Sequence, residues 1–291
     1  MWIASPGRAG KPNQVVLLDP ATGKIDQSIP FDVEPQHLAL SDDGKFLYVA
    51  ASGRIFRCDI GNLSIDRDFR IPALDLRSTP MEAYSMAVVP GHPDRVLVSL
   101  DSPSSSPDYW GTVLFEDGVP AAQRLVAPGP AHIFGWLDES TVVGGYGRDL
   151  YYASVDRGVQ MLRVMNGVLP IDGDCTLLDG LLYCSSGAVL DAAAGAYLRQ
   201  YPARGTVGLA PAVDRAVYFD RGTQVMAGGA TYGPMVTVRP SSGEFLSAAV
   251  VPVSTAMTMS GAGGEWLVLR PTILAAGYTR TADRLYLFRL P

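Results

Sequence analysis

One stretch of the sequence, Glu34 to Ile71, contains the pattern of a complete four-stranded unit in a single pass. Four short runs rich in apolar and β-forming residues occupy it, and turn residues separate them: Gln36–Leu40, Phe46–Ala50, Arg54–Ile60 and Leu63–Ile71. The turns are Ser41-Asp42-Asp43-Gly44, Ser52-Gly53 and Gly61-Asn62, and Pro72 ends the unit. Consecutive strands joined by tight turns predict an antiparallel sheet.

The same strand and turn pattern recurs along the chain at intervals of about 40 to 50 residues. The predicted units cover residues 1–33, 34–72, 82–128, 132–170, 174–203, 206–252 and 255–291. A β-sandwich does not produce such a period, whereas sheets repeated around a central axis do. We therefore expect an all-β protein, a single domain over residues 1–291, folded as a seven-bladed β-propeller of four-stranded antiparallel blades.

The first and last units each lack one strand. Residues 1–31 contain only three strand candidates, Trp2–Ser5, Gln14–Asp19 and Lys24–Ile29, and the first strand of the unit is missing. The last unit ends with Arg284–Leu290. One segment upstream of Met1 would supply both missing strands of a closed ring, so we expect the chain to be part of a longer protein. The alternative is that both terminal blades have three strands.

Two hairpins far apart in the sequence match each other, VVLLDPATGKIDQSI and AVLDAAAGAYLRQY. Leu18-Asp19 and Gly23 of the first correspond to Leu190-Asp191 and Gly195 of the second. Helix propensity alone favours a helix at Ala192–Ala196, but the repeat position predicts a turn there.

Composition excludes several classes of function. The formal net charge is −6 and no basic or acidic block occurs, which argues against nucleic acid because phosphate binding requires clustered Lys and Arg. No apolar run approaches the length of about 18 residues that would indicate a transmembrane helix, so no membrane insertion is expected. The start of the chain, Met1-Trp2-Ile3-Ala4, lacks the charged and apolar regions of a signal peptide.

The unit at residues 34–50 resembles the repeats of the YVTN-repeat propellers, a YVTN/lactonase-like and WD40-like family. Its pattern appears as Glu34-Pro35, Leu38-Ala39-Leu40, Ser41-Asp42-Asp43-Gly44 and Leu47-Tyr48-Val49-Ala50, and VVLLDPATGKI completes it. MEAYSMAVVPGHPDRVLVSL and GAVLDAAAGAYL are similar to segments of secreted bacterial propellers without assigned activity. The resemblance implies an extracytoplasmic (periplasmic or secreted) location and leaves function open, since propellers host many unrelated activities.

The cysteines, Cys58, Cys175 and Cys184, fit no zinc spacing. If Asp179-Gly180 is a two-residue turn, Cys175 faces Cys184 at a non-hydrogen-bonded position, where Cα atoms are about 4.5 Å apart. Two alternatives remain open for this pair, a disulfide or two buried thiols in contact.

Candidate ligand-binding residues precede or begin the innermost strands, whose starts converge at one mouth of a propeller channel. They are Glu34, His37, Glu82, Tyr84, His132, Asp172 and Asp174. Carboxylates and imidazoles converging there could hold a divalent cation whose bound water attacks an ester or lactone, as in lactonase-like propellers. The alternative is that these side chains cap strand ends or hydrate the channel.

Catalytic templates are missing from the sequence, which contains no G-x-S-x-G, Walker A, H-E-x-x-H or G-x-G-x-x-G before a helix. We therefore assign no catalytic residue. Gly144-Gly145-Tyr146-Gly147 fits a turn, His92 a solvated loop, and Trp136 and Trp266 packing between blades.

Three functional hypotheses follow. The leading one is a monomeric, non-catalytic binding or scaffold propeller without a cofactor, whose loops Asp101–Tyr109 and Gly228–Pro234 contact a protein or small-molecule partner. The second is a metal-dependent, lactonase-like hydrolase using Glu34, Glu82, His132 and Asp174. The third, implied only by the repeat class, is a subunit of a quinoprotein-type amine dehydrogenase.

Overall fold

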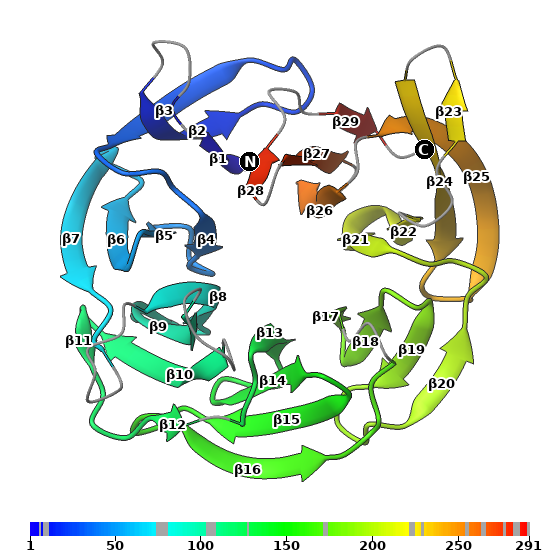
Figure 1. The fold of residues 1–291 in the computed structure, drawn as a ribbon. Coiled ribbons are helices and arrows are strands. Elements are labelled where there is room, and N and C mark those ends of the chain that lie inside the picture. The colour runs from blue at the N-terminus through cyan, green and yellow to red at the C-terminus, as the bar shows by residue number, and fades with distance from the viewer. Residues whose placement is uncertain are drawn as a thin grey trace. The chain divides into compact units, whose positions relative to one another are not determined.

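The computed structural model describes residues 1–5, 7, 12–73, 81–102, 109–126, 128–170, 174–220, 225–227, 230–253, 256–262, 266–275, 278–281 and 286–289. Within these ranges the strands form seven antiparallel sheets, which we number 1 to 7 in chain order (Figure 1). The chain divides into two compact units, Met1–Leu169 with sheets 1 to 4 and Pro170–Pro291 with sheets 5 to 7.

The strands of the first unit are, in sheet 1, β1 (Trp2–Ser5), β2 (Asn13–Leu18) and β3 (Ile25–Phe31); in sheet 2, β4 (His37–Leu40), β5 (Phe46–Ala51), β6 (Arg54–Asp59) and β7 (Ser64–Arg70); in sheet 3, β8 (Glu82–Val89), β9 (His92–Asp101), β10 (Tyr109–Glu116), β11 (Val119–Pro120) and β12 (Leu125–Val126); and in sheet 4, β13 (His132–Trp136), β14 (Thr141–Tyr146), β15 (Asp149–Ser154) and β16 (Gln160–Met165).

The strands of the second unit are, in sheet 5, β17 (Cys175–Leu178), β18 (Leu181–Cys184), β19 (Ala188–Asp191) and β20 (Tyr197–Gln200); in sheet 6, β21 (Thr206–Ala210), β22 (Arg215–Phe219), β23 (Val225–Ala227), β24 (Ala230–Arg239) and β25 (Glu244–Val253); and in sheet 7, β26 (Ala256–Ala262), β27 (Trp266–Ala275), β28 (Tyr278–Thr281) and β29 (Tyr286–Arg289). A short 3-10 helix, η1 (Pro211–Val213), joins β21 to β22. In the part of the chain that is described, no helix is long and apolar enough to cross a membrane.

Each sheet lies within one of the seven predicted repeat ranges, except that β25 of sheet 6 extends one residue past its range, and the all-β prediction is confirmed. Within each unit, the first strands of successive sheets lie side by side. In the first unit β8 lies between β4 and β13, and in the second β21 lies between β17 and β26 (Figure 1).

A recurring bulge identifies equivalent strand pairs in five sheets. In each, the register between the last two strands skips one residue near the start of the outer strand: Asp26, Asp66, Leu162, Leu198 and Leu246. In sheet 1 this pair is β2–β3, so β1 corresponds to a second strand. Among the described residues sheet 1 has three strands and no counterpart of the first, as predicted.

The two matching hairpins form matching turns. The amide of Gly23 donates to the carbonyl oxygen of Asp19 at 2.8 Å, and the amide of Gly195 donates to that of Asp191 at the same distance. Each carboxylate also accepts an amide hydrogen bond inside its turn, from Ala21 to Asp19 and from Ala194 to Asp191. The predicted turn after Asp191 is therefore confirmed.

Apolar cores fill the space between adjacent sheets, and strand alternation assigns each residue to one of them. Leu47, Val49 and Ala51 of β5 pack toward sheet 1, whereas Tyr48 and Ala50 of the same strand pack toward sheet 3. A middle strand buried on both faces needs apolar residues at nearly every position. This explains why the β5 sequence, FLYVAA, is almost continuously apolar.

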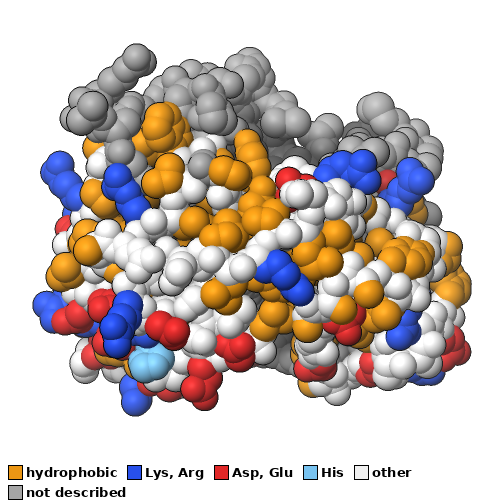
Figure 2. Space-filling view, turned by 90° about the horizontal axis from the view of Figure 1, so that it is seen from below, with side chains coloured by type: hydrophobic (Ala, Val, Ile, Leu, Met, Phe, Trp, Pro, Cys, Tyr) orange, Lys and Arg blue, Asp and Glu red, His pale blue; other side chains and the backbone are white. Residues whose placement is uncertain are grey.

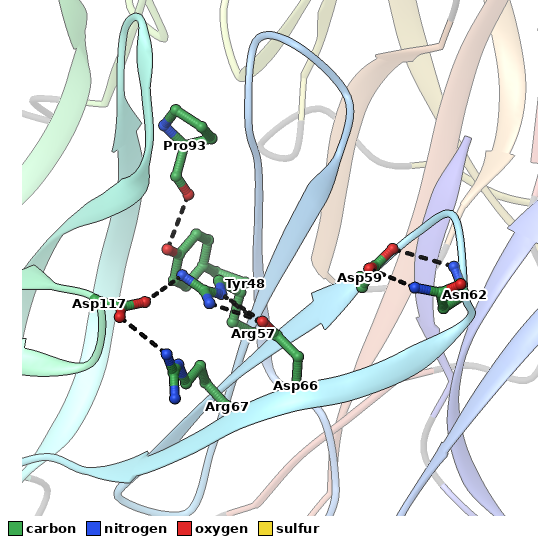
Figure 3. A network of polar contacts seen from close by, with 8 residues as sticks. All are labelled: Tyr48, Arg57, Asp59, Asn62, Asp66, Arg67, Pro93 and Asp117. Carbon is green, nitrogen blue, oxygen red and sulfur yellow. Dashed lines mark hydrogen bonds and ion pairs between the residues drawn. The ribbon is translucent and has the colours of Figure 1, made fainter.

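A polar network joins sheets 2 and 3 at their turn ends (Figure 3). Arg57 of β6 is only 6% exposed, and its Nε and Nη2 donate to the two carboxylate oxygens of Asp66 at 3.1 and 2.7 Å. Its Nη1 donates to Asp117 in the turn after β10 at 2.8 Å, and Arg67 donates to the other oxygen of Asp117 at 2.9 Å. Asp66 is the residue skipped by the β6–β7 register, so the bulge directs its carboxylate toward Arg57.

Further contacts at these turn ends strengthen the same junction. The hydroxyl of Tyr48 donates to the carbonyl oxygen of Pro93 at 2.9 Å, and the carboxylate of Asp42 accepts from the amide of Gly91 at 2.8 Å (Figure 3 draws the first). Burial raises the pKa of Tyr48 to about 12. The hydrogen bond from Arg57, followed by that from Arg67, lowers the pKa of Asp117.

Cys175 of β17 lies opposite Cys184 of β18, and the structure joins them in a disulfide. Leu178 pairs with Leu181 around the Asp179-Gly180 turn, whose residues both have positive φ, as a two-residue hairpin turn requires. Of the two alternatives for these cysteines, the structure therefore contains the disulfide. Cys58 is free and buried between sheets 1 and 2, and burial raises the pKa of its thiol to about 12.

Two expectations need correction. The predicted loop Gly228–Pro234 is wrong from Ala230 onward, because β24 begins there and pairs with both β23 and β25; Gly228-Gly229 lie outside the described residues. In sheet 7, β28 was not predicted, because β27 continues through Pro271 to Ala275. Strand β27 pairs with β29 near its start and with β28 near its end, so among the described residues the sheet is nowhere more than three strands wide.

The outer strands leave apolar side chains exposed, among them Val119, Val126, Leu162 and Val164 in the first unit. On the face drawn in Figure 2, hydrophobic side chains (orange) lie among polar ones, and most of the acidic side chains (red) lie toward the lower edge. Single exposed apolar residues are usual on soluble proteins and define no site by themselves.

Replacing Arg57 should destabilise the protein much more than replacing Arg67, although both side chains bind Asp117. Arg57→Met leaves two carboxylates without their buried partner, and we expect a loss of about 2 kcal/mol in the free energy of unfolding. Arg67 is 49% exposed, so Arg67→Met should cost about 0.5 kcal/mol or less. Urea denaturation of both variants measures the difference, and equal midpoints would contradict the assignment of Arg57 as the junction residue.

Candidate functional site

The candidate residues of the first unit lie at the starts of adjacent first strands. His37 begins β4, Glu82 begins β8 and His132 begins β13, with β8 between the other two. Glu34 is exposed and precedes β4 by three residues. Asp174 is exposed directly before β17 in the second unit, and Asp172 lies outside the described residues.

A bulge in β8 sets the position of Tyr84. The register pairs Ala83 with Leu100 and Ser85 with Ser99, so it skips Tyr84, which marks a bulge. Its hydroxyl lies 2.8 Å from Nε2 of His132, and the two rings meet edge to face with centroids 4.8 Å apart. The Tyr84 side chain remains 37% exposed. The bulge thus directs an accessible phenol from sheet 3 onto an imidazole of sheet 4.

Two serines of sheet 3, Ser85 in β8 and Ser99 in β9, hydrogen-bond to the backbone on either side of His132. Ser99 is fully buried, and its hydroxyl donates to the carbonyl oxygen of Ala131 at 2.6 Å. The hydroxyl of Ser85 accepts from the amide of Ile133 at 3.3 Å. Because Ala131 and Ile133 flank His132, these hydrogen bonds fix the backbone that carries the imidazole.

Two glycines of β14 allow this strand to lie close to β13. Gly144 and Gly145 lie within β14, not in the turn that the sequence suggested, and the turn follows at Gly147. A Cβ atom at Gly144 would collide with the carbonyl oxygen of His132, and one at Gly145 with the ring of Phe134. Glycine is therefore required here for backbone packing.

The imidazole of His37 is partly buried beside β5. His37 pairs with Ala50 in the β4–β5 register, and the amide of Gln36 donates to the carbonyl oxygen of Ala50 at 2.8 Å. Burial lowers the pKa of His37, so the ring is neutral at neutral pH. Glu82 lies opposite Asp101 in the β8–β9 register, which places two carboxylate residues side by side at the same end of sheet 3.

In the described ranges, no three His, Cys, Asp or Glu side chains lie close enough together to bind one metal ion. The cation site expected from Glu34, Glu82, His132 and Asp174 therefore stays a prediction. His92 is exposed, as expected, but it begins β9 and does not lie in a loop. Trp136 packs against the core between sheets 3 and 4, as expected.

The sequence indicates Tyr84 and His132 as separate candidates, and it predicts neither their contact nor the two serines that support it. The signal for the serines was present, since Ser85 and Ser99 are polar residues inside the apolar runs AYSMAVV and VLVSL. Polar residues at such positions need buried hydrogen-bond partners.

No protein-family model matches the chain, and no curated protein matches it. Among solved structures it is similar to one described as "Dihydro-heme d1 dehydrogenase NirN in complex with DHE", with a TM-score of 0.54 and 14% sequence identity. The similarity covers 100% of this chain and 64% of that one, so the chain spans less than two thirds of this neighbour.

The fold is a β-propeller. The repeated antiparallel sheets with first strands side by side are the blades of this propeller, and Tyr84 and His132 belong to neighbouring blades. At 14% identity the similarity shows the fold alone, so the neighbour's ligand and activity do not transfer to this chain.

The lowered pKa of His37 predicts a pH-dependent stability. In the unfolded chain His37 takes up a proton near pH 6.5, whereas in the folded chain it does so only at lower pH. The contribution of His37 to the free energy of unfolding is therefore fully present above about pH 6.5 and is lost as the pH falls. His37→Gln should therefore lose less stability than the wild type between about pH 7.5 and 5.5. Urea denaturation at several pH values measures this, with His92→Gln as the control for removing an imidazole. An unchanged pH dependence in His37→Gln would contradict the burial of this ring.

Proposed function

We propose that the chain is a non-catalytic binding propeller whose ligand contacts Tyr84 and His132 at the starts of β8 and β13. The observation that carries the proposal is the β8 bulge, which gives up one strand pairing and directs an accessible phenol onto an imidazole of the next blade. Bulges are frequent beside binding sites because they redirect a side chain.

The chemistry of the pair supports a binding role. Tyr84 offers an exposed aromatic ring and a hydroxyl, and His132 offers a second ring with two nitrogen atoms. Sites for small ligands combine aromatic surface with a few fixed polar groups. Ser85 and Ser99 fix the backbone on both sides, which lowers the entropy lost when a ligand binds.

His37 and Glu82 extend the proposed site along β4 and β8, and Glu34 adds a carboxylate before β4. Asp174 belongs to the second unit and is a separate candidate residue. Loop contacts remain part of the proposal, although residues 103–108 of the Asp101–Tyr109 segment lie outside the described residues. The partner is a small molecule or a protein segment, and the propeller acts as a monomer.

The finer family and the location are also proposed. Seven repeats at regular spacing, together with the S-D-D-G and L-Y-V-A segments of sheet 2, support a seven-bladed propeller of the YVTN type. The resemblance to secreted bacterial propellers supports an extracytoplasmic location, where the Cys175–Cys184 disulfide would persist.

A ligand screen with matched variants tests the proposal. A fragment library together with hemin, chosen because of the haem-type name of the structural neighbour, is screened by spectra of labelled tyrosine and histidine rings. We expect ligands that perturb Tyr84 and His132 and whose binding weakens at least tenfold in Tyr84→Ala. His92→Ala, a change at an exposed turn, should leave their affinity unchanged. Hits that map elsewhere, or that bind Tyr84→Ala equally well, would reject this site.

The metal-dependent hydrolase is the alternative outcome of the same work. Thermal shifts with Ca²⁺, Zn²⁺ and a chelator should be absent if the site is non-catalytic. A stabilising ion whose effect disappears in Glu82→Gln or His132→Gln would favour the hydrolase instead.

A further inference from the structure

Three tyrosines lie together in the second unit, in the core between sheets 5 and 6. They are Tyr183 of β18, Tyr201 just after β20 and Tyr218 of β22, and none is more than 3% exposed. The ring centroids of Tyr201 and Tyr218 are 5.9 Å apart. This cluster lies outside the proposed ligand site and has no part in it.

The hydroxyls of Tyr201 and Tyr218 are buried, and within the described part of the chain neither has a hydrogen-bond partner of good geometry, although the Arg199 side chain lies close enough to Tyr201 to oppose the rise of its pKa. The other buried members of the cluster are apolar and offer no side-chain donor or acceptor: Val189, Ala203, Val207, Ala216 and Val238. A buried hydroxyl without a partner is destabilising, and folded proteins rarely contain one. Two in one cluster therefore require an explanation.

Tyr183 and Tyr218 are each influenced electrostatically by other phenols of the cluster. Burial raises the pKa of Tyr218 well above its usual value, and Tyr201 and Tyr183 raise it further. Burial also raises the pKa of Tyr183 to about 12, with Tyr201 as the next contributor. Arg199 opposes the effect of burial at Tyr201, and its Nη1 donates to the carbonyl oxygen of Pro240 in sheet 6 at 3.4 Å.

We propose that the hydroxyls of Tyr201 and Tyr218 bind one internal water molecule between sheets 5 and 6, with Tyr183 beside them. A buried water needs about two to four polar partners, and each phenol can both donate and accept. Ala203 and Ala216 are the smallest side chains of the cluster. The water joins two blades of the second unit as the Arg57 network joins two blades of the first.

Tyr→Phe variants test the proposed water, because the proposal predicts that they lower Tm. If a shared water bridges the hydroxyls, Tyr201→Phe and Tyr218→Phe each remove a hydrogen bond, and each should lower Tm by about 2 °C. If the hydroxyls have no partner, Phe removes a buried polar group at no loss, and Tm should stay the same or rise. Tyr197→Phe, at a residue 59% exposed on β20, is the control and should leave Tm unchanged.

The double variant tests whether the water is shared. Tyr201→Phe/Tyr218→Phe should lower Tm by less than the sum of the single changes. The reason is that the first substitution already removes one hydrogen bond of the water, so less binding remains for the second substitution to remove. A crystal structure at high resolution should show a water within hydrogen-bonding distance of both hydroxyls. A Tm at or above the wild-type value in either single variant, full additivity, or two hydroxyls bonded directly to protein atoms would overturn the proposal.

Discussion

A buried guanidinium requires both a neutralising charge and partners for its N–H groups, and Arg57 finds them only where two blades meet. Asp66 comes from its own sheet, but Asp117 belongs to the next. The apolar cores between sheets are non-directional and would tolerate small sliding movements. The geometry of Arg57 with Asp66 and Asp117 is directional, so it fixes how sheet 2 faces sheet 3.

The two ends of the sheets in the first unit therefore have different tasks. At the turn ends, Arg57, Tyr48 and Asp42 of sheet 2 hold the turns of sheet 3. At the opposite ends, where β8 and β13 begin, Tyr84 contacts His132 and stays accessible. Structural cross-links and candidate binding groups are separated along the strands, which allows the binding end to vary without loosening the blades.

Much of the architecture could be predicted because it depends on local patterns. The spacing of apolar runs and turns located every sheet, and the Asp179-Gly180 turn placed Cys175 opposite Cys184. Bulges were not predictable, since skipping one residue such as Tyr84 leaves the composition of a strand unchanged. Strand β28 was missed because β27 continues through Pro271, a residue that usually marks the end of a strand. The Arg57–Asp117 contact joins residues 60 positions apart in the sequence, and no local sequence pattern predicts it.

A double-mutant cycle on Arg57 and Asp117 tests most directly whether this contact holds the two blades in place. The free energy of unfolding is measured for the wild type, Arg57→Met, Asp117→Asn and the double variant. If Arg57 acts through Asp117, Asp117→Asn should destabilise the wild type but have little further effect once Arg57 is Met. Equal effects of Asp117→Asn in both backgrounds would mean that the two side chains act independently, and the account of the junction between sheets 2 and 3 would be wrong.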